Sequence, residues 1–185
     1  MIFNHHLLFK KLFNETICID FQGRCYPVYF YEADLFELNK ALLNAKTKYP
    51  LIWLQTGYSK KERTNSGRIE LDNLSFFIIT KGDQTDRYDK RFATSFHGIV
   101  YPIIDGFLNI IKSRSGIGFG SNDYTTTDLP FNDVAELMTR QQKAKPQTAS
   151  VPDIWDATIL DIDLTVHPDC YPEYYIKNLK QAKIC

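Results

Sequence analysis

The chain has 185 residues, which suits one domain and is enough sequence to bury a sizeable core. Its 22 basic and 22 acidic residues give a formal net charge of zero. A general nucleic-acid-binding protein is normally basic, so this balance argues against that class while permitting a local basic patch. No run approaches the roughly 18 apolar residues of a membrane span, and the N-terminus lacks the basic start and cleavage site of a signal peptide. We therefore expect a protein made and kept in a cytoplasm, with no membrane partner.

The first part of the chain predicts a helix followed by two strands. Apolar residues in Ile2–Phe13 recur with helical spacing, so we expect a helix that covers a sheet or docks on a partner. Residues 16–20 and 25–31 predict two strands joined by a turn that contains a glycine. Pro27 lacks a backbone N–H, which favours an edge strand, and nearby aromatic residues such as Tyr29 suit an interface. Pro27 and Tyr29 are therefore candidate contacts with a partner or another subunit.

The next segment predicts a capped helix and two buried strands. Asp34 is placed to cap a helix, with Glu37 three residues later in the position that completes a capping box. Residues 50–54 form a short apolar run that predicts a buried strand. Residues 71–80 include a Phe-Phe-Ile-Ile run without polar alternation, which is typical of a strand covered on both faces. We expect this central strand to anchor the core.

The longest predicted helix follows the central strand, from near residue 86 to Ser113. Its apolar residues recur at spacings of three and four and form one stripe. Pro102 falls inside it, and the lost hydrogen bond and ring clash should kink the helix at a cost of about 3 kcal/mol. His97 lies just before the proline, but no motif places a nucleophile or a partner beside it. We interpret His97 as a structural or surface residue.

A polar connection, residues 56–70, separates the two buried strands. Its charged residues are basic Lys60, Lys61, Arg63 and Arg68 and acidic Glu62 and Glu70. Hairpin loops usually have about two to five residues, and longer ones are often functional. The connection is either a disordered, solvated loop or a hairpin-like arm that contacts another subunit or a phosphate backbone. We favour an arm that contacts protein, because the acidic residues dilute the positive charge.

Residues 113–153 show little periodicity and are rich in turn-forming residues. Gly116, Gly118 and Gly120 alternate, a spacing that differs from the GxGxxG pattern of phosphate-binding loops. Such a long aperiodic stretch is unusual inside a compact domain. We expect an extended insertion, or an arm ordered by a neighbour, within a single domain that spans residues 1–185.

The clearest strand pattern lies at residues 154–166, where apolar residues alternate with polar ones. We expect an antiparallel strand with one face on the helices and the other in water or against another subunit. Asp161 and Asp163 lie on the same side of this strand and could form a metal-binding or acid/base pair. No further motif completes such a site, so a solvated strand face is the favoured interpretation.

The cysteines and histidines predict no metal centre. The four cysteines include no CxxC pair and no histidine at ligand spacing, so we expect reduced thiols, with a Cys18–Cys25 bridge across a hairpin as the alternative. His5 and His6 are adjacent, so their rings should diverge on a helix. Zinc needs three or four converging ligands, which the sequence does not place.

The order of these elements is that of an α+β protein, with helices packed on a mixed, mostly antiparallel sheet and long loop insertions. It resembles the tail-terminator and neck proteins of tailed bacteriophages, and also the ring proteins stacked below the portal in crAss-like phages. The resemblance covers residues 1–112 and 154–166 and is one of pattern and length. The matching segments are Tyr49-Pro-Leu-Ile-Trp-Leu54, Arg68–Ile79, Arg91–Leu108 and Trp155–Val166. The 113–153 insertion departs from the compact form of the family.

The resemblance implies a structural protein of the virion rather than an enzyme, and it brings no catalytic residue, cofactor or metal with it. Such a protein forms a closed homo-oligomeric ring, a hexamer or dodecamer, at the head–tail junction or the tail end. Its partners are neighbouring portal, neck or tail proteins, and viral DNA passes through the lumen without sequence specificity. It is made in the cytoplasm of the host bacterium.

Two other functions fit the residues. One is a metal-dependent nuclease that uses Asp161, Asp163 and either Glu70 or Asp72 as ligands. The other is a monomeric adaptor domain that binds one host or viral partner. The three hypotheses differ in cation binding and in assembly.

Overall fold

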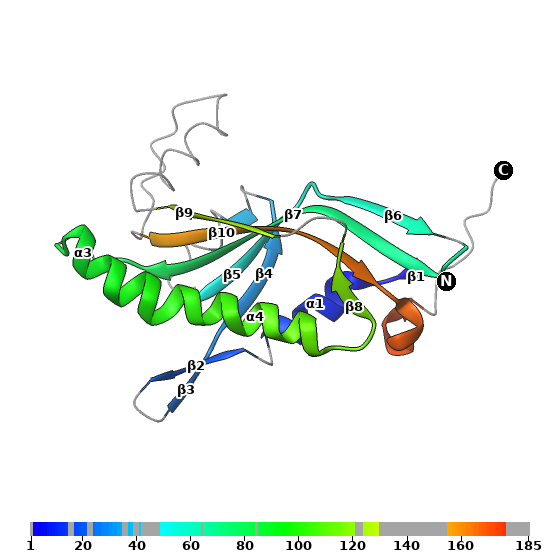
Figure 1. Ribbon diagram of the computed structural model, residues 1–185, viewed down its shortest axis with the longest axis horizontal. Coiled ribbons are helices and arrows are strands. Elements are labelled where there is room, and N and C mark those ends of the chain that lie inside the picture. Colours follow the sequence, from blue (N-terminus) through cyan, green and yellow to red (C-terminus); the bar gives the residue numbers. More distant parts are fainter. Residues whose placement is uncertain are drawn as a thin grey trace.

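The computed structural model describes residues 2–14, 17–21, 24–34, 37–38, 41, 49–63, 65–83, 85–120, 124–129 and 155–176. Its centre is a seven-stranded sheet in the order β4-β5-β7-β10-β8, in which β6 also pairs with β7 and β9 with β10 (Figure 1). β4 and β5 are parallel, and the other pairs of this sheet are antiparallel. The predicted α+β class, with helices on a mostly antiparallel sheet, is confirmed.

The strands of this sheet are β4 (Tyr29–Ala33), β5 (Leu51–Gln55), β6 (Ser59–Arg63), β7 (Arg68–Lys81), β8 (Ile117–Phe119), β9 (Thr125–Leu129) and β10 (Trp155–Val166). Two smaller pairs lie outside it. β1 (Ile2–Phe3) pairs with β11 (Tyr175–Ile176), and β2 (Cys18–Phe21) forms a hairpin with β3 (Arg24–Pro27). In Figure 1 this hairpin projects away from the sheet, beyond the long helix.

The sheet is organised around its two longest strands, β7 and β10, which run antiparallel along nearly their whole length. β5 and β6 follow one another along the outer side of β7, while β8 and β9 do the same along the outer side of β10. The alternation predicted for residues 154–166 is confirmed, because even-numbered residues from Leu160 to Val166 are buried in the main core. The central strand is longer than predicted, since β7 begins at Arg68.

The helices whose bounds lie in the described residues are α1 (His5–Asn14), a continuous helix made of α3 (Tyr88–Arg91), η1 (Phe92–Val100) and α4 (Tyr101–Ser113), and two 3₁₀ turns, η2 (Pro168–Cys170) and η3 (Pro172–Tyr174). The η1 segment is π-helical: the Tyr101 N–H donates to the Phe96 carbonyl, five residues back. Pro102 therefore sits in the first turn of α4, immediately after a widened segment of helix. We expected a kink at the proline; the structure instead places its missing N–H where π-helix gives way to α-helix.

The main core lies between one face of the sheet and the long helix with α1. Phe13 of α1 stacks on Phe107 of α4 with ring centroids 4.2 Å apart, and Phe76 of β7 meets Phe107 edge-on at 4.7 Å. All three side chains are fully buried. A second apolar cluster lies on the opposite face of the sheet, toward the end of β7. It contains Leu38, Leu51, Trp53, Phe77, Ile79, Leu129, Trp155 and Ala157.

The N-terminal predictions need three corrections. The segment predicted as a helix from Ile2 begins as strand β1, and α1 starts at His5 with His5, Leu8 and Phe9 buried while His6 is exposed. The strand predicted at residues 25–31 is divided between β3 and β4. Cys18 and Cys25 are joined by a disulfide across the β2–β3 hairpin, so the expectation of reduced thiols is wrong for this pair. The Asp34 cap is confirmed, as its Oδ1 accepts the Glu37 N–H at 2.8 Å.

The predicted insertion at residues 113–153 is also partly wrong. Its first part contains β8 and β9, which both belong to the main sheet. β8 was missed because it has only three residues, and β9 because Thr125–Asp128 are exposed and show no apolar alternation. The rest of the predicted insertion, residues 130–153, lies outside the described residues.

Candidate functional site

The predicted polar connection at residues 56–70 is a regular hairpin. β6 pairs with Arg68–Asp72 of β7, and a turn joins the two strands. We call this hairpin, residues 59–72, the arm. β6 has the sequence Ser-Lys-Lys-Glu-Arg and only one partly buried residue, so pairing with β7 rather than an apolar pattern makes it a strand. In Figure 1 the arm continues the sheet beyond β5.

A β-bulge marks the base of the arm. Leu164 is opposite Leu71 and Ile162 is opposite Leu74, so Asp163 faces two residues of β7. One of them, Asn73, has a positive φ of 61°, and its N–H donates to Asp163 Oδ1 at 2.8 Å. A bulge adds one residue to one strand. Leu71 and Leu74 can therefore share the same core despite their odd spacing.

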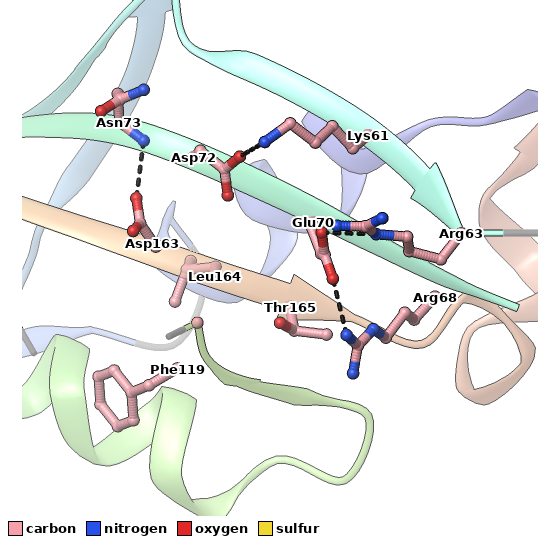
Figure 2. Close-up of a pocket in the computed structure, with 11 residues that line it drawn as sticks. Lys61, Arg63, Arg68, Glu70, Asp72, Asn73, Phe119, Asp163, Leu164 and Thr165 are labelled. Atoms are coloured by element: carbon pink, nitrogen blue, oxygen red, sulfur yellow. Dashed lines mark hydrogen bonds and ion pairs between the residues drawn. The ribbon is translucent and has the colours of Figure 1, made fainter. Parts of the chain in front are cut away.

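One face of the arm carries a ladder of ion pairs, shown in Figure 2. Lys61 Nζ lies 2.6 Å from Asp72 Oδ2, joining β6 to β7. Glu70 is shared by two guanidinium groups, with Arg63 Nε at 2.9 Å and Arg68 at 2.8 Å. Side chains alternate across a strand, so Lys60 and Glu62 lie on the opposite face, where they pair with each other at 2.7 Å.

The ladder forms one wall of an open depression of about 620 Å³, which we call the trough. Its lining residues come from β6, β7 and β10 and from the end of β8 (Figure 2): Lys61, Arg63, Arg68, Glu70, Asp72, Asn73, Phe119, Gly120, Asp163, Leu164 and Thr165. Three basic and three acidic side chains line it, so their formal charges cancel. At Gly120 a Cβ atom would lie 2.6 Å from Asp163 Cβ, so only glycine allows this close approach without a shift.

The ion pairs shift the pKa values of the groups that form them. The hydrogen bond from Arg63, followed by that from Arg68, lowers the pKa of Glu70. The hydrogen bond to Asp72 raises the pKa of Lys61. Because these pairs are in contact with water, each adds little to folding stability. Their value is in fixing side-chain positions and the charge pattern that a partner would meet.

The structure gives no support to the metal-binding alternative in the part of the chain that it describes. Ser75 donates to Asp161 at 2.5 Å, and the Asn73 N–H donates to Asp163. Glu70 and Asp72 are bound to arginine and lysine. Within the described ranges, no group of three or more His, Cys, Asp or Glu side chains is placed to hold a metal ion.

The predicted contact residues fall on separate surfaces. Lys61, Arg63 and Arg68 come together at the trough, whereas Lys60 is on the far side of the arm. Pro27 is exposed at the end of β3 in the projecting hairpin. Tyr29 is half-buried and packs against the second apolar cluster.

Sequence reasoning missed a polar network around His5. His5 Nε2 lies 2.8 Å from the Tyr58 hydroxyl, which donates to Glu32 Oε1 at 2.7 Å, and His6 Nδ1 lies 2.5 Å from Glu32 Oε2. The two histidine rings do not diverge as predicted, since their centroids are 4.1 Å apart. The only signal was Tyr58, the single aromatic residue in the connection at residues 56–70.

Among the helices of the described residues, none is long and apolar enough to cross a membrane. No protein-family model matches the chain, and no curated protein matches it.

Proposed function

We propose that this chain is a structural virion protein, without enzymatic activity, that forms a homo-oligomeric ring at the head–tail junction or tail end of a tailed bacteriophage. The ring would surround the DNA channel and contact neighbouring portal, neck or tail proteins. The order of elements in the sequence suggests this class. The observation that carries the proposal is the charged trough on an arm that continues the sheet beyond β5.

The trough has the properties of a contact surface between protein subunits. It is concave, and its charges of both signs are held in place by ion pairs. A partner with the complementary pattern would meet a defined register, and a shifted partner would meet like charges. A closed ring is built from one such surface on each subunit and a different surface on the next. One arm per subunit would therefore be repeated around the whole ring.

The same charges favour protein over DNA as the partner of the arm. Lys61 and Arg63 are each engaged by a carboxylate, and Arg68 shares Glu70 with Arg63. A phosphate would have to compete with these carboxylates, and it would meet a surface with no net charge. We infer that this face does not bind the DNA that passes through the ring. Any DNA contacts elsewhere on the subunit are to phosphates and independent of sequence.

The test is to remove the basic side of the ladder and measure assembly. The triple variant Lys61→Ser, Arg63→Ser, Arg68→Ser should keep the fold but lose the charge pattern of the ladder. The matched control, Lys10→Ser, Lys11→Ser, Lys112→Ser, removes the same charge from exposed positions on α1 and α4. Native mass spectrometry, alone and with neighbouring virion proteins, should show rings for the wild type and the control and monomers for the arm variant.

Three results would contradict the proposal. Normal assembly of the arm variant would show that the trough is not part of the interface between subunits. A wild-type chain that stays monomeric, even with the neighbouring proteins, would support the adaptor alternative. Micromolar binding of Mg²⁺ or Mn²⁺ in calorimetry would support the nuclease alternative.

A further inference from the structure

The network around His5 joins three elements at the base of the arm. His5 and His6 begin α1, Glu32 lies on β4, and Tyr58 lies in the short break between β5 and β6. His5 is almost fully buried, and its ring meets Tyr58 and Phe9 edge-on, at 5.8 Å and 6.0 Å between centroids. A change in the protonation or position of His5 therefore acts directly on Tyr58, in the break between β5 and the arm.

The hydrogen bonds determine which nitrogen of His5 carries the proton. A phenol hydroxyl has one hydrogen, and that of Tyr58 is donated to Glu32. Toward His5 the Tyr58 oxygen must accept, so the His5 Nε2 carries the N–H. The neutral ring then has its lone pair on Nδ1, and this buried atom has no hydrogen-bond partner among the residues that the structure describes.

Glu32 is the acceptor in this network because it is ionised. Burial opposes ionisation, but the hydrogen bonds from His6 and Tyr58 outweigh it and lower the pKa of Glu32. Burial, followed by the hydrogen bond to Glu32, raises the pKa of Tyr58. The hydroxyl therefore stays protonated and keeps donating to the carboxylate.

A second proton on His5 would reside on Nδ1. This atom is buried, and within the described ranges no acceptor is placed to receive a hydrogen bond from it. Burial, followed by the nearby His6 and Lys60, lowers the pKa of His5 to about 4, although Glu32 acts in the opposite direction. A histidine released to water has a pKa of about 6.5. Protons therefore bind the released form of His5 in preference to the buried form.

The start of the chain also lies against the tip of the arm. β1 pairs with β11, and the Asn4 N–H donates to the Tyr174 carbonyl at 2.9 Å. Phe3 and Tyr175 line a small pocket of about 150 Å³ together with Arg63 and Arg68. The start of the chain thus lies beside the arm at both ends: His5 bonds Tyr58 at its base, and Phe3 lines a pocket with Arg63 and Arg68 near its tip.

We propose that His5, Tyr58 and Glu32 form an acid-operated latch, which holds the start of α1 against the base of the arm at neutral pH and releases it when His5 is protonated. Closure has its full stability above about pH 6.5 and loses it as the pH falls toward about 4. In this window the opening equilibrium should rise by up to about tenfold per pH unit, because opening takes up one proton. The rest of α1 stays in place through Phe9 and Phe13, which are fully buried in the core.

Hydrogen exchange on the full chain tests the latch. Exchange would be followed from about pH 7.5 to about pH 4.5, with correction for the intrinsic pH dependence of the exchange chemistry. In the wild type, the amides of residues 7–10 and 56–60 should lose protection by up to about tenfold per pH unit below about pH 6.5. Amides of Phe76–Ile79 in β7, which pair with β5 and β10 rather than with β6, and amides of β10 should remain protected and serve as internal controls.

Two variants separate His5 from its neighbour. His5→Gln retains an N–H donor for Tyr58 but cannot take up a proton, so its protection should not depend on pH. His6→Gln changes the exposed ring and should keep the wild-type dependence. An equal pH dependence in wild type and His5→Gln would overturn the proposal, as would loss of protection in Phe76–Ile79 and β10 at the same pH.

A second measurement keeps the proposal testable if His5→Gln does not fold. NMR of the wild type at about pH 5.5 should show the His5 ring as the neutral Nε2–H tautomer in those molecules in which the α1 amides remain protected from exchange. A ring that titrates near pH 6.5 while residues 7–10 stay protected would show that protonation does not open the latch.

Discussion

The two ends of β7 use the same face of the sheet in opposite ways. Toward the end of the strand, Phe77 and Ile79 are buried in the second apolar cluster, against Trp53 of β5. Toward its start, Glu70 and Asp72 line the charged trough. β10 repeats the contrast, with Ala157 in the cluster and Asp163 in the trough. One pair of strands therefore builds both an apolar core and the charged trough, which we propose as a contact surface, and a short boundary divides them.

This boundary is visible in every strand that crosses it. The break between β5 and β6, the bulge at Asn73, its partner Asp163 and the gap between β8 and β9 all fall at one level of the sheet. A bulge bends a strand and increases its local twist. The arm can thus leave the packed part of the sheet while β7 continues without interruption. Strand pairing is common to both halves. They differ in whether other side chains cover this face of the sheet and in the backbone geometry at the boundary.

The largest difference between the two halves should appear on removing a side chain from each. Phe77→Ala should lower the free energy of unfolding by about 3–5 kcal/mol, because it opens a cavity in the second cluster. Thr165→Ala, in the trough, should change it by no more than about 0.5 kcal/mol. Urea denaturation of both variants measures the contrast. A loss below about 1 kcal/mol for Phe77→Ala would mean that the cluster is not packed as described.

A glycine pair probes the boundary itself. A Cβ at Gly120 would lie 2.6 Å from Asp163 Cβ and 3.2 Å from its backbone, whereas a Cβ at Gly118 has nothing within 4 Å. Gly120→Ala should therefore cost about 1–3 kcal/mol through overpacking, and Gly118→Ala should be much less harmful. Thermal denaturation of the two variants under matched conditions measures the difference. Equal effects would show that β8 can move away from β10 without loss.

At the bulge, a substitution that raises strand propensity should lower the free energy of unfolding. Valine is a better strand former than asparagine, so a regular strand would gain from Asn73→Val. At a φ of 61° a β-branched residue is strained, and the variant should lose about 1–2 kcal/mol. Asn73→Gly, which suits a positive φ, is the matched control and should unfold close to the wild type. A stabilised Asn73→Val in urea denaturation would argue against the bulge.

Much of the packed half was predictable from the sequence. β10 has a clean alternation, and the run Phe76–Ile79 has the pattern of a strand covered on both faces. The long helix was predicted because its apolar stripe is uninterrupted, although the π-helical accommodation of Pro102 depends on hydrogen bonds that no spacing reveals. These elements could be read because burial in the core imposes a period on the residues.

The charged half of the sheet, around the trough, was harder to predict for the same reason. β6 and β9 are exposed and leave no apolar period, so only their pairing with β7 and β10 makes them strands. The basic residues of the arm were identified, but their acidic partners at Asp72 and Glu70 depend on register. The contact between His5 and Tyr58 spans 53 positions along the chain. A contact of that range depends on the folded sheet rather than on local spacing.

The smallest expected effect concerns the charge of the ladder. Hydrogen bonds from Arg63 and then Arg68 lower the pKa of Glu70, so folding favours its ionised form. This contribution is present above the ordinary carboxyl pKa of about 4.3 and is lost as the pH falls through the lower pKa of the folded state. The melting temperature of the wild type should therefore fall between about pH 5 and about pH 3 more steeply than that of Glu70→Gln.

The control for this effect is Asp105→Asn, which removes one exposed carboxylate from α4 and should keep the wild-type dependence. Because the ladder is open to water, salt near 1 M should reduce the difference between wild type and Glu70→Gln, since screening then acts over about 3 Å. Differential scanning calorimetry across the pH series measures both effects. Parallel curves for wild type and Glu70→Gln would mean that the ladder adds nothing measurable to the stability of the isolated chain.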